Sequence, residues 1–393
     1  MRRRGVVVGL CLLVACSKEA PGFSDLGSAL DGGEDARPAD DAANAADVAV
    51  AVDAGIADDQ GVVDGDGGSD SGLEPDGSLP VDAGIPVDAA LSLDAGLPVD
   101  AGLPLDAGQT TGPGPYDRDG PEVVLEATIP VDTGMRSFDE HVFIPGGPGP
   151  YPVVSLSPGL QQRSSAYFPY LRRLASHGII AISHDDFGAL VQTTAATSAL
   201  LYLVGTWLPA MNADAASPLF GKIDVARVGL GGHSRGGKAS LIAAETAPAG
   251  QVVAWFGIDP IDAATLSGGV DASDGLGALH LPLTFLGATV SGACSPAPDN
   301  YEVLYAAANA PAVKISALNA GHVAFEDPAE CRLCGLCNPA GSADPAVVLA
   351  YSRRYLTAYF ARELLGDRAV GAAFEGAGAP QDQAAGLVTI TAK

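Results

Sequence analysis

Residues 225–239 of the chain read VARVGLGGHSRGGKA. The first half has the apolar, glycine-rich composition of a buried strand, and the second half predicts a helix that begins at Arg235. Gly232 and Gly236 flank Ser234 and permit a sharp, strained turn between the two elements. This turn would hold the Ser234 hydroxyl at the end of the strand, where the amino terminus of the helix faces a developing oxyanion. We therefore predict that Ser234 is a nucleophile on a strand–turn–helix elbow.

Short β-branched runs alternate with amphipathic stretches from Val123 onward. This alternation is typical of an α/β fold in which helices flank a mostly parallel central sheet. The predicted strands are residues 123–129, 138–144, 151–156, 179–183, 227–231, 252–258, 281–287 and 312–318. The predicted helices are residues 164–176, 195–213, 235–246, 300–308 and 345–365. We place this domain at residues 121–370 and treat 371–393 as a C-terminal tail, because its weak pattern predicts no element.

The segment before the domain, residues 17–120, has the composition of a disordered tether. Residues 17–115 contain 21 acidic residues against Lys18 and Arg37, with Phe23 as the single aromatic residue. Such a segment cannot bury enough apolar surface to offset the entropy cost of ordering it. An imperfect six-residue repeat that begins VDAGIP occupies residues 81–108. Its prolines and its single carboxylate per unit favour an extended spacer over a β-helix or a calcium-binding repeat.

The chain is strongly acidic, with a formal net charge of −26 at pH 7. Most of this charge comes from the tether, and no basic patch in the sequence suggests nucleic-acid binding. The charge therefore argues against nucleic acid as a partner and against binding of the domain to an anionic membrane surface.

The amino terminus has the pattern of a secretion signal, with three arginines followed by an apolar run too short to cross a bilayer. The sequence LVAC at residues 13–16 resembles the bacterial lipobox, whose cysteine is acylated and becomes the first residue of the mature protein. We therefore predict a lipoprotein signal at residues 1–16 and an extracytoplasmic protein anchored in membrane lipid through Cys16. Ser17 favours the bacterial outer membrane. The alternative is an ordinary cleaved signal that contains a cysteine.

Four further cysteines lie in the second half of the chain: Cys294, Cys331, Cys334 and Cys337. Disulfides are the default in an exported, oxidising setting, so we predict that Cys294 pairs with one of the other three. Thiolates spaced by two residues also suit tetrahedral zinc, which is the competing interpretation. We predict no metal, because the sequence offers no convincing fourth ligand nearby.

A serine nucleophile needs a base, and two histidines follow Ser234 in the chain. His280 comes just before a predicted strand. His322 follows the last predicted strand of the domain, in a loop that Gly321 marks. We predict that His322 is the base and that His280 is a structural residue.

The base in turn needs an acid that orients it. Asp259 comes directly after the predicted strand 252–258, whereas the loop after strand 281–287 reads ATVSGA and contains no carboxylate. We therefore predict Asp259 as the acid, with Asp262 as the alternative.

An oxyanion needs two backbone N–H donors, one of which comes from the residue after the nucleophile. The second comes from the loop after the third predicted strand, here SPGLQ at residues 157–161. We predict the N–H groups of Leu160 and Arg235 as this pair. Such a site requires no metal or organic cofactor. The lone cluster His184-Asp185-Asp186 is interpreted as a strand-end turn, with a metal site as the alternative.

The same segments resemble known hydrolase families. The runs GHSRGG at 232–237 and GIDPID at 257–262, together with CSP at 294–296 and GH at 321–322, resemble chlorophyllases over roughly residues 121–365. The run LASHGII at 174–180, after the SPG turn, resembles both the secreted platelet-activating-factor acetylhydrolases and the cutinase-like polyester hydrolases. The resemblance implies an α/β-hydrolase fold, and its triad maps onto Ser234, Asp259 and His322.

Two departures bear on the substrate. Pro158 stands where chlorophyllases carry a histidine, and Leu160 replaces the aromatic residue with which polyester hydrolases grip a flat ring. Residues and resemblance together imply a monomeric serine carboxylesterase that acts on small-molecule, lipid or polyester esters. The alternatives are a phospholipase or acetylhydrolase-like lipid ester hydrolase, or a surface binding protein that keeps the fold without catalysis. The Gly- and Ala-rich loop 263–279 is expected to border the substrate.

Overall fold

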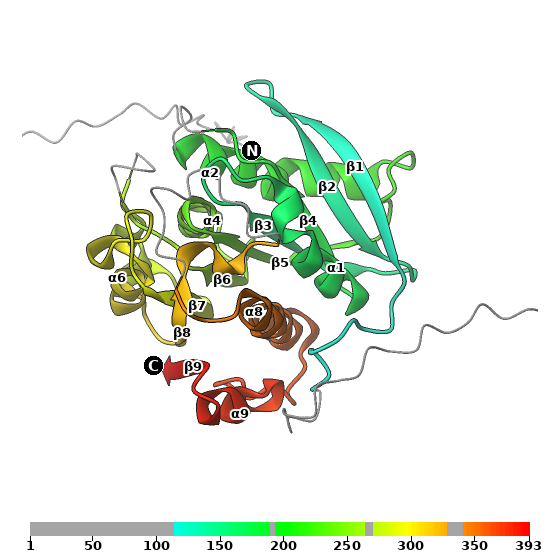
Figure 1. Ribbon diagram of the computed structural model, residues 1–393. Coiled ribbons are helices and arrows are strands. Elements are labelled where there is room, and N and C mark those ends of the chain that lie inside the picture. Colours follow the sequence, from blue (N-terminus) through cyan, green and yellow to red (C-terminus); the bar gives the residue numbers. More distant parts are fainter. Residues whose placement is uncertain (1–113, 189–192, 264–269, 328–340) are drawn as a thin grey trace, which may run out of the picture. The chain divides into compact units, whose positions relative to one another are not determined.

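The computed structural model describes residues 114–188, 193–263, 270–327 and 341–393 (Figure 1). Their centre is a nine-stranded sheet with the strand order β1-β2-β4-β3-β5-β6-β7-β8-β9. The strands are β1 (Val124–Asp132), β2 (Ser137–Pro145), β3 (Tyr151–Ser157), β4 (Ile180–His184), β5 (Ile223–His233), β6 (Ala254–Ile258), β7 (Leu283–Val290), β8 (Ala312–Gly321) and β9 (Val388–Ala392). The six central strands, β4-β3-β5-β6-β7-β8, are parallel to one another. β1 pairs with β2, β2 with β4, and β9 with β8 in antiparallel fashion. The α/β fold is thus confirmed.

Burial explains why these segments form strands. In β3 every residue after Tyr151 is buried, as expected for a parallel strand covered on both faces. In β1, at the edge of the sheet, exposed and partly buried residues largely alternate along the strand.

Helices cover both faces of the sheet (Figure 1). One hydrophobic cluster joins the sheet to α1 (Phe168–Ser176) and α8 (Pro345–Phe360). A second cluster joins the opposite face to α2 (Thr193–Tyr202), α3 (Leu208–Ala213), α4 (Arg235–Thr246) and α6 (Tyr301–Ala307). Shorter helical turns are η1 (Ser164–Tyr167), η3 (Ala272–Asp274), η4 (Leu276–Ala278), η5 (Ala297–Asp299) and η6 (His322–Phe325).

Two of the predicted helices contain a π-helical turn. The segment predicted as one helix over 195–213 is α2, then the π-turn η2 (Leu203–Trp207), then α3. The segment predicted over 345–365 is α8 followed by the π-turn η7 (Ala361–Leu365). An apolar pattern does not distinguish these forms, because an added residue in one turn leaves the buried stripe largely in place.

The sheet domain includes residues that the sequence assigns to a tail and a tether. Residues 371–393 contain η8 (Glu375–Ala377), α9 (Ala379–Ala384) and β9, which pairs with β8. Phe374 and Val388 belong to the core. At the other end, Tyr116 is buried and its hydroxyl bonds to the Asp367 carboxylate. The boundary at residue 370 is therefore wrong, because the tail completes the edge of the sheet.

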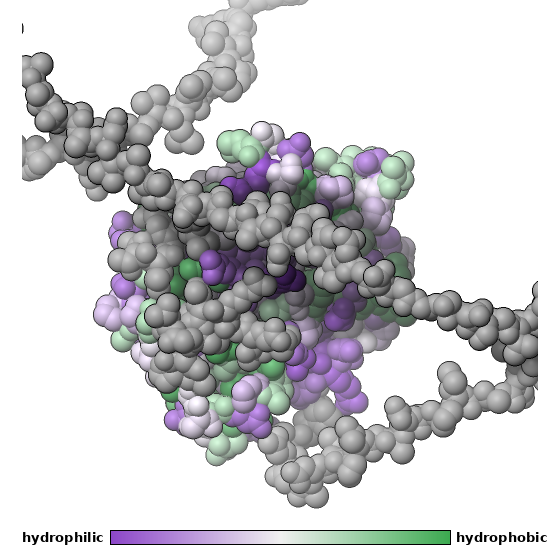
Figure 2. All heavy atoms as spheres, turned by 45° about the horizontal axis from the view of Figure 1, so that its top comes forward, coloured by the Kyte–Doolittle hydropathy of each residue, from purple (hydrophilic) through white to green (hydrophobic). Residues whose placement is uncertain are grey.

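The surface of the described residues is mixed. On the face that Figure 2 shows, hydrophilic and hydrophobic residues lie interspersed over the coloured part. The most exposed large apolar side chain is Met135, at the turn between β1 and β2. Among the described helices, none has the length and hydropathy needed to cross a bilayer. The predicted signal with Cys16, the tether up to residue 113, its repeat and part of loop 263–279 lie outside the described residues.

Candidate active site

Ser234 lies at the turn between β5 and α4, as predicted. Its φ and ψ angles are 55° and −124°, a strained conformation for a residue with a side chain. Gly232 and Gly236 permit this turn, because a Cβ on Gly232 would lie 2.4 Å from the carbonyl carbon of Gly236. A Cβ on Gly236 would lie 2.3 Å from the Ser157 carbonyl oxygen. The Ser234 N–H donates to the Ile258 carbonyl at 3.0 Å, which fixes the elbow against β6.

His322 is the first residue of η6, directly after β8. Its Nε2 lies 2.9 Å from Ser234 Oγ, and both side chains are buried. His280, by contrast, is exposed in the loop before β7, at the end of the sheet where the parallel strands begin. The structure thus brings His322 to the serine and leaves His280 away from it.

Asp259 follows β6 and lies on the other side of the His322 ring. Its Oδ2 is 2.6 Å from His322 Nδ1, and its Oδ1 accepts the Ala288 N–H at 3.0 Å. The carboxylate can only accept, so Nδ1 carries the ring proton and Nε2 is free to accept the hydroxyl proton of Ser234. The side chain of Asp259 is fully buried, which excludes water from this contact.

Asp262 points to a different set of partners. Its Oδ1 lies 3.3 Å from Nζ of the buried Lys238. Its two carboxylate oxygens also accept the N–H groups of Ala272 and Ser273 at 2.7 and 3.0 Å. Asp262 is therefore engaged in holding a loop, whereas Asp259 is the aspartate in contact with His322.

The loop after β3 lies against Ser234. A Cβ on Gly159 would come within 3.3 Å of Ser234 Cβ, so only a glycine allows this approach without displacement. The next residues are anchored by Asp186, which accepts the Gln161 N–H at 2.8 Å and forms an ion pair with the Arg235 guanidinium. The two residues predicted to supply oxyanion donors, Leu160 and Arg235, thus belong to segments that flank Ser234.

The cluster His184-Asp185-Asp186 is a strand-end structure, each member of which has protein partners. His184 Nδ1 lies 3.0 Å from a Glu140 carboxylate oxygen. Asp185 accepts both the N–H and the hydroxyl of Ser164, at 2.9 and 2.7 Å. The two aspartates therefore hold both ends of the segment between Gln161 and Ser164.

Four positions around the site have a strained backbone. Among the described residues, five that are not glycine have positive φ angles, and four of these are Gln161, Ser234, Asp259 and Asn319. They follow the carboxyl ends of β3, β5 and β6 or lie just before His322 near the end of β8. Strain of this kind persists only where surrounding contacts hold it, and it concentrates at functional sites.

A family model described as Chlorophyllase matches residues 129–338, which is more than half of the chain and includes Ser234, Asp259 and His322. The chain belongs to the chlorophyllase family. No curated protein matches it. Membership supports an ester-hydrolase function of the α/β-hydrolase kind and a small-molecule ester as the substrate.

Next to Ser234 and His322 of this chlorophyllase-family chain lies a buried polar group that sequence reasoning missed. It consists of Tyr167, His233 and Glu326, all of which are buried. Burial, with His322 nearby, lowers the pKa of His233 well below its ordinary value. Burial also raises the pKa of the Glu326 carboxyl to about 8. The signal in the sequence is a histidine directly before Ser234, yet nothing in the sequence identifies its hydrogen-bond partners.

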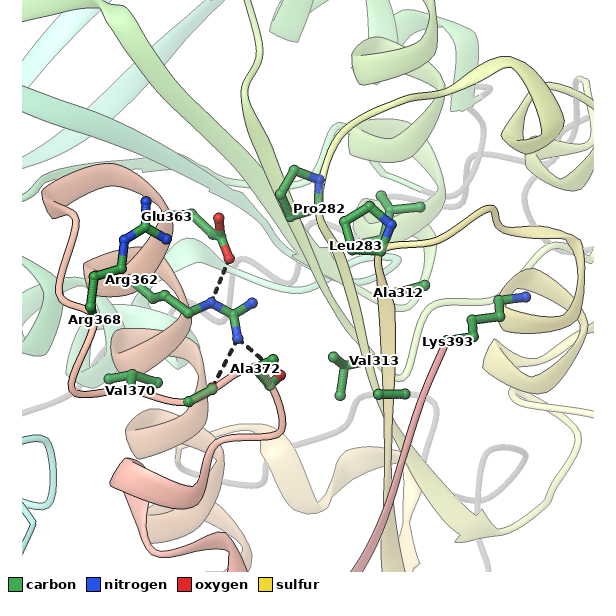
Figure 3. Close-up of a pocket in the computed structure, with 13 residues that line it drawn as sticks. Pro282, Leu283, Ala312, Val313, Arg362, Glu363, Arg368, Val370, Ala372 and Lys393 are labelled. Carbon is green, nitrogen blue, oxygen red and sulfur yellow. Dashed lines mark hydrogen bonds and ion pairs between the residues drawn. The ribbon is translucent and has the colours of Figure 1, made fainter.

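A hollow of about 420 Å³ lies far from these residues, at the amino ends of β7 and β8 (Figure 3). Its floor is apolar, with Leu283 and Val313, and Arg362 at its side pairs with Glu363 and donates to the Ala372 carbonyl at 2.9 Å. Ser234 and Asp259 follow the carboxyl ends of parallel strands, so this hollow opens at the opposite edge and does not hold the reacting ester.

Of the predicted cysteines, Cys294 lies in the described loop after β7, whereas Cys331, Cys334 and Cys337 lie outside the described residues.

Proposed function

We propose that this chlorophyllase-family chain is a serine carboxylesterase that forms a covalent acyl-enzyme on Ser234. One observation carries the proposal: His322 contacts Ser234 Oγ at 2.9 Å through Nε2 and the buried Asp259 at 2.6 Å through Nδ1. This series of contacts gives the serine a base of the correct tautomer.

In the first step Ser234 Oγ bonds to the ester carbonyl carbon, and His322 Nε2 takes the hydroxyl proton. The carbonyl oxygen becomes an oxyanion, which the N–H groups of Leu160 and Arg235 stabilise by about 3 kcal/mol each. When the carbon–oxygen bond to the alcohol breaks, His322 gives its proton to the leaving oxygen. Asp259 stays ionised throughout and stabilises the imidazolium.

In the second step water repeats the same sequence on the acyl-enzyme. His322 takes a proton from the attacking water, the oxyanion forms again, and the proton returns to Ser234 Oγ as the acid leaves. Each step balances in protons, so the residues named supply all the groups that hydrolysis needs.

The test uses the full chain, p-nitrophenyl acyl esters and a fluorophosphonate probe. Ser234→Ala should abolish burst and turnover and prevent labelling, with a loss on the order of 10⁵-fold or more in kcat. Ser240→Ala is the matched control, since Ser240 is a buried serine of α4 whose hydroxyl donates to the Gly237 carbonyl at 2.9 Å. Unchanged turnover in Ser234→Ala would refute the proposal, and a wild-type chain that neither turns over esters nor takes the label would favour a binding protein.

We further propose that the protein is extracytoplasmic, lipid-anchored through Cys16 and stabilised by a disulfide of Cys294. The lipobox-like residues 13–16 and the four remaining cysteines support this proposal. Mass spectrometry of the chain purified from membranes should find an acylated Cys16 as the first residue. Non-reducing peptide mapping should link Cys294 to Cys331, Cys334 or Cys337. An unmodified Cys16 in the mature chain, or free thiols at all four positions, would contradict the corresponding part.

A further inference from the structure

We propose that His233 and Tyr167 are positioning residues whose hydrogen bonds tie the oxyanion loop at Gly159 to the backbone of the base His322. The inference rests on the proposed function, because it gives these two residues a role in the same site. Neither residue touches the reacting atoms. They act through the segments that carry Leu160 and His322.

The hydrogen-bond chain has one consistent arrangement of protons. His233 Nε2 lies 3.0 Å from the His322 carbonyl oxygen, which can only accept, so Nε2 carries the proton. In a neutral ring Nδ1 is then the acceptor, and the Tyr167 hydroxyl, 2.7 Å away, donates to it. The Tyr167 oxygen in turn accepts the Gly159 N–H at 3.3 Å. Each hydrogen bond in this series therefore has one donor and one acceptor.

The surroundings keep the His233 ring neutral. The side chain of His233 is 1 % exposed, and its pKa is lowered by burial and by the neighbouring His322. The acid next to the ring is Glu326, whose Oε1 lies 3.5 Å from Nδ1. This distance is too long for a strong hydrogen bond. Burial raises the pKa of this carboxyl to about 8, so at pH 7 its protonated form predominates and favours a neutral His233 ring.

This series of hydrogen bonds connects three separate segments of the site. Gly159 precedes Leu160 after β3, His233 precedes Ser234 at the end of β5, and His322 follows β8. The ring of His233 also packs on that of His322, with their centroids 4.6 Å apart. The bond to the His322 carbonyl fixes the backbone from which the base projects. The bond through Tyr167 fixes the oxyanion loop relative to that backbone, and misplacement of such groups by about 1 Å costs rate rather than substrate affinity.

The chain offers a matched pair of tyrosines for the test. Tyr359 is buried like Tyr167, and its hydroxyl also accepts a backbone N–H, from Trp255 at 3.1 Å, and donates, to the Pro282 carbonyl at 2.6 Å. Its hydroxyl lies at the amino ends of β6 and β7, whereas Ser234 follows the carboxyl end of β5. Tyr359→Phe therefore removes an equivalent hydroxyl without touching the site.

Steady-state kinetics of the full chain on a p-nitrophenyl ester should separate the two variants. Tyr167→Phe should lower kcat about tenfold and change KM by less than about twofold, whereas Tyr359→Phe should keep the wild-type kcat even if its melting temperature falls. The wild-type chain and Ser234→Ala are measured alongside. A wild-type kcat in Tyr167→Phe, or an equal loss in Tyr359→Phe, overturns the inference while leaving the proposed function intact.

His233 variants test the other end of the chain. His233→Leu removes the donor to the His322 carbonyl, whereas His233→Gln can restore it through its side-chain amide. We expect kcat to fall at least as far in His233→Leu as in Tyr167→Phe and to recover in part in His233→Gln. In proton NMR, the low-field signal of the His322 Nδ1 proton should shift in Tyr167→Phe and His233→Leu but not in Tyr359→Phe. An unshifted signal together with equal rates in both His233 variants overturns the inference.

Discussion

Asp259 and Asp262 are two buried carboxylates three residues apart that serve different partners. Asp259 has a φ angle of 38°, and its strained backbone turns the side chain towards His322. Asp262 lies against Lys238, a lysine with no exposed surface. Removing the partner of a buried cation destabilises the fold much more than removing the partner of a surface cation, because the buried charge is left uncompensated.

Substitution of Asp259 should therefore lower the rate, whereas substitution of Asp262 should lower the stability of the fold. Asp259→Asn should lower kcat by about 10³- to 10⁴-fold, because an amide can donate to Nδ1 and favour the wrong tautomer of His322. Asp262→Asn should destabilise the fold by roughly 3 kcal/mol and keep kcat per folded molecule within about threefold of the wild type. Urea unfolding and active-site titration of both variants separate stability from rate. A large fall in kcat in Asp262→Asn alone would make Asp262 the acid.

The sequence predicts the residues of the site whose position depends on chain order. Ser234 follows a strand and precedes a helix, His322 follows the last central strand, and Asp259 is favoured because the next loop lacks a carboxylate. Tyr167 and His233 escape prediction, because their contact joins residues 66 positions apart and depends on side-chain packing between η1 and the end of β5. No local pattern encodes such a contact.

At the scale of elements, predictability follows burial. The central strands are continuous apolar runs because helices cover both of their faces, so β3, β5 and β6 lie within a few residues of their predicted bounds. Strand β9 has five residues, of which Val388 alone is buried, so its pattern is too short to predict a strand. Its partner β8 supplies the information that its own sequence lacks, through five paired residues from Val313 to Ala317.

The turn between β5 and α4 both shapes the fold and positions Ser234. β5, Ser234 and α4 close through Gly232 and Gly236, and a side chain at either glycine would collide with backbone atoms. The same close approach brings the loop after β3 against the start of α4, where Asp186 and the Arg235 guanidinium pair. The glycines that permit the turn therefore also allow the loop after β3 to lie against Ser234.

At the scale of the whole molecule, burial of acids should make stability depend on pH. Glu245 and Glu326 both have a carboxyl pKa raised by burial to about 8, against an ordinary value of 4.5. For Glu245, the nearby Asp262 and Asp274 add to the shift. Below pH 4.5 both carboxyls are protonated in the folded and the unfolded chain. Between pH 4.5 and 8 the unfolded chain loses these protons while the folded chain keeps them, so the free energy of unfolding falls as pH rises.

Glu326→Gln should remove its part of this decline, because glutamine is neutral at every pH. Each such carboxyl contributes a slope of at most about 1.4 kcal/mol per pH unit. Between pH 5 and pH 8 the variant should therefore lose less stability than the wild type, with a difference on the order of 3 kcal/mol. Urea unfolding of the full chain at both pH values measures this difference, with Glu375→Gln, at an exposed glutamate, as the control. A pH dependence equal to that of the wild type in Glu326→Gln would mean that the carboxyl is ionised in the folded chain.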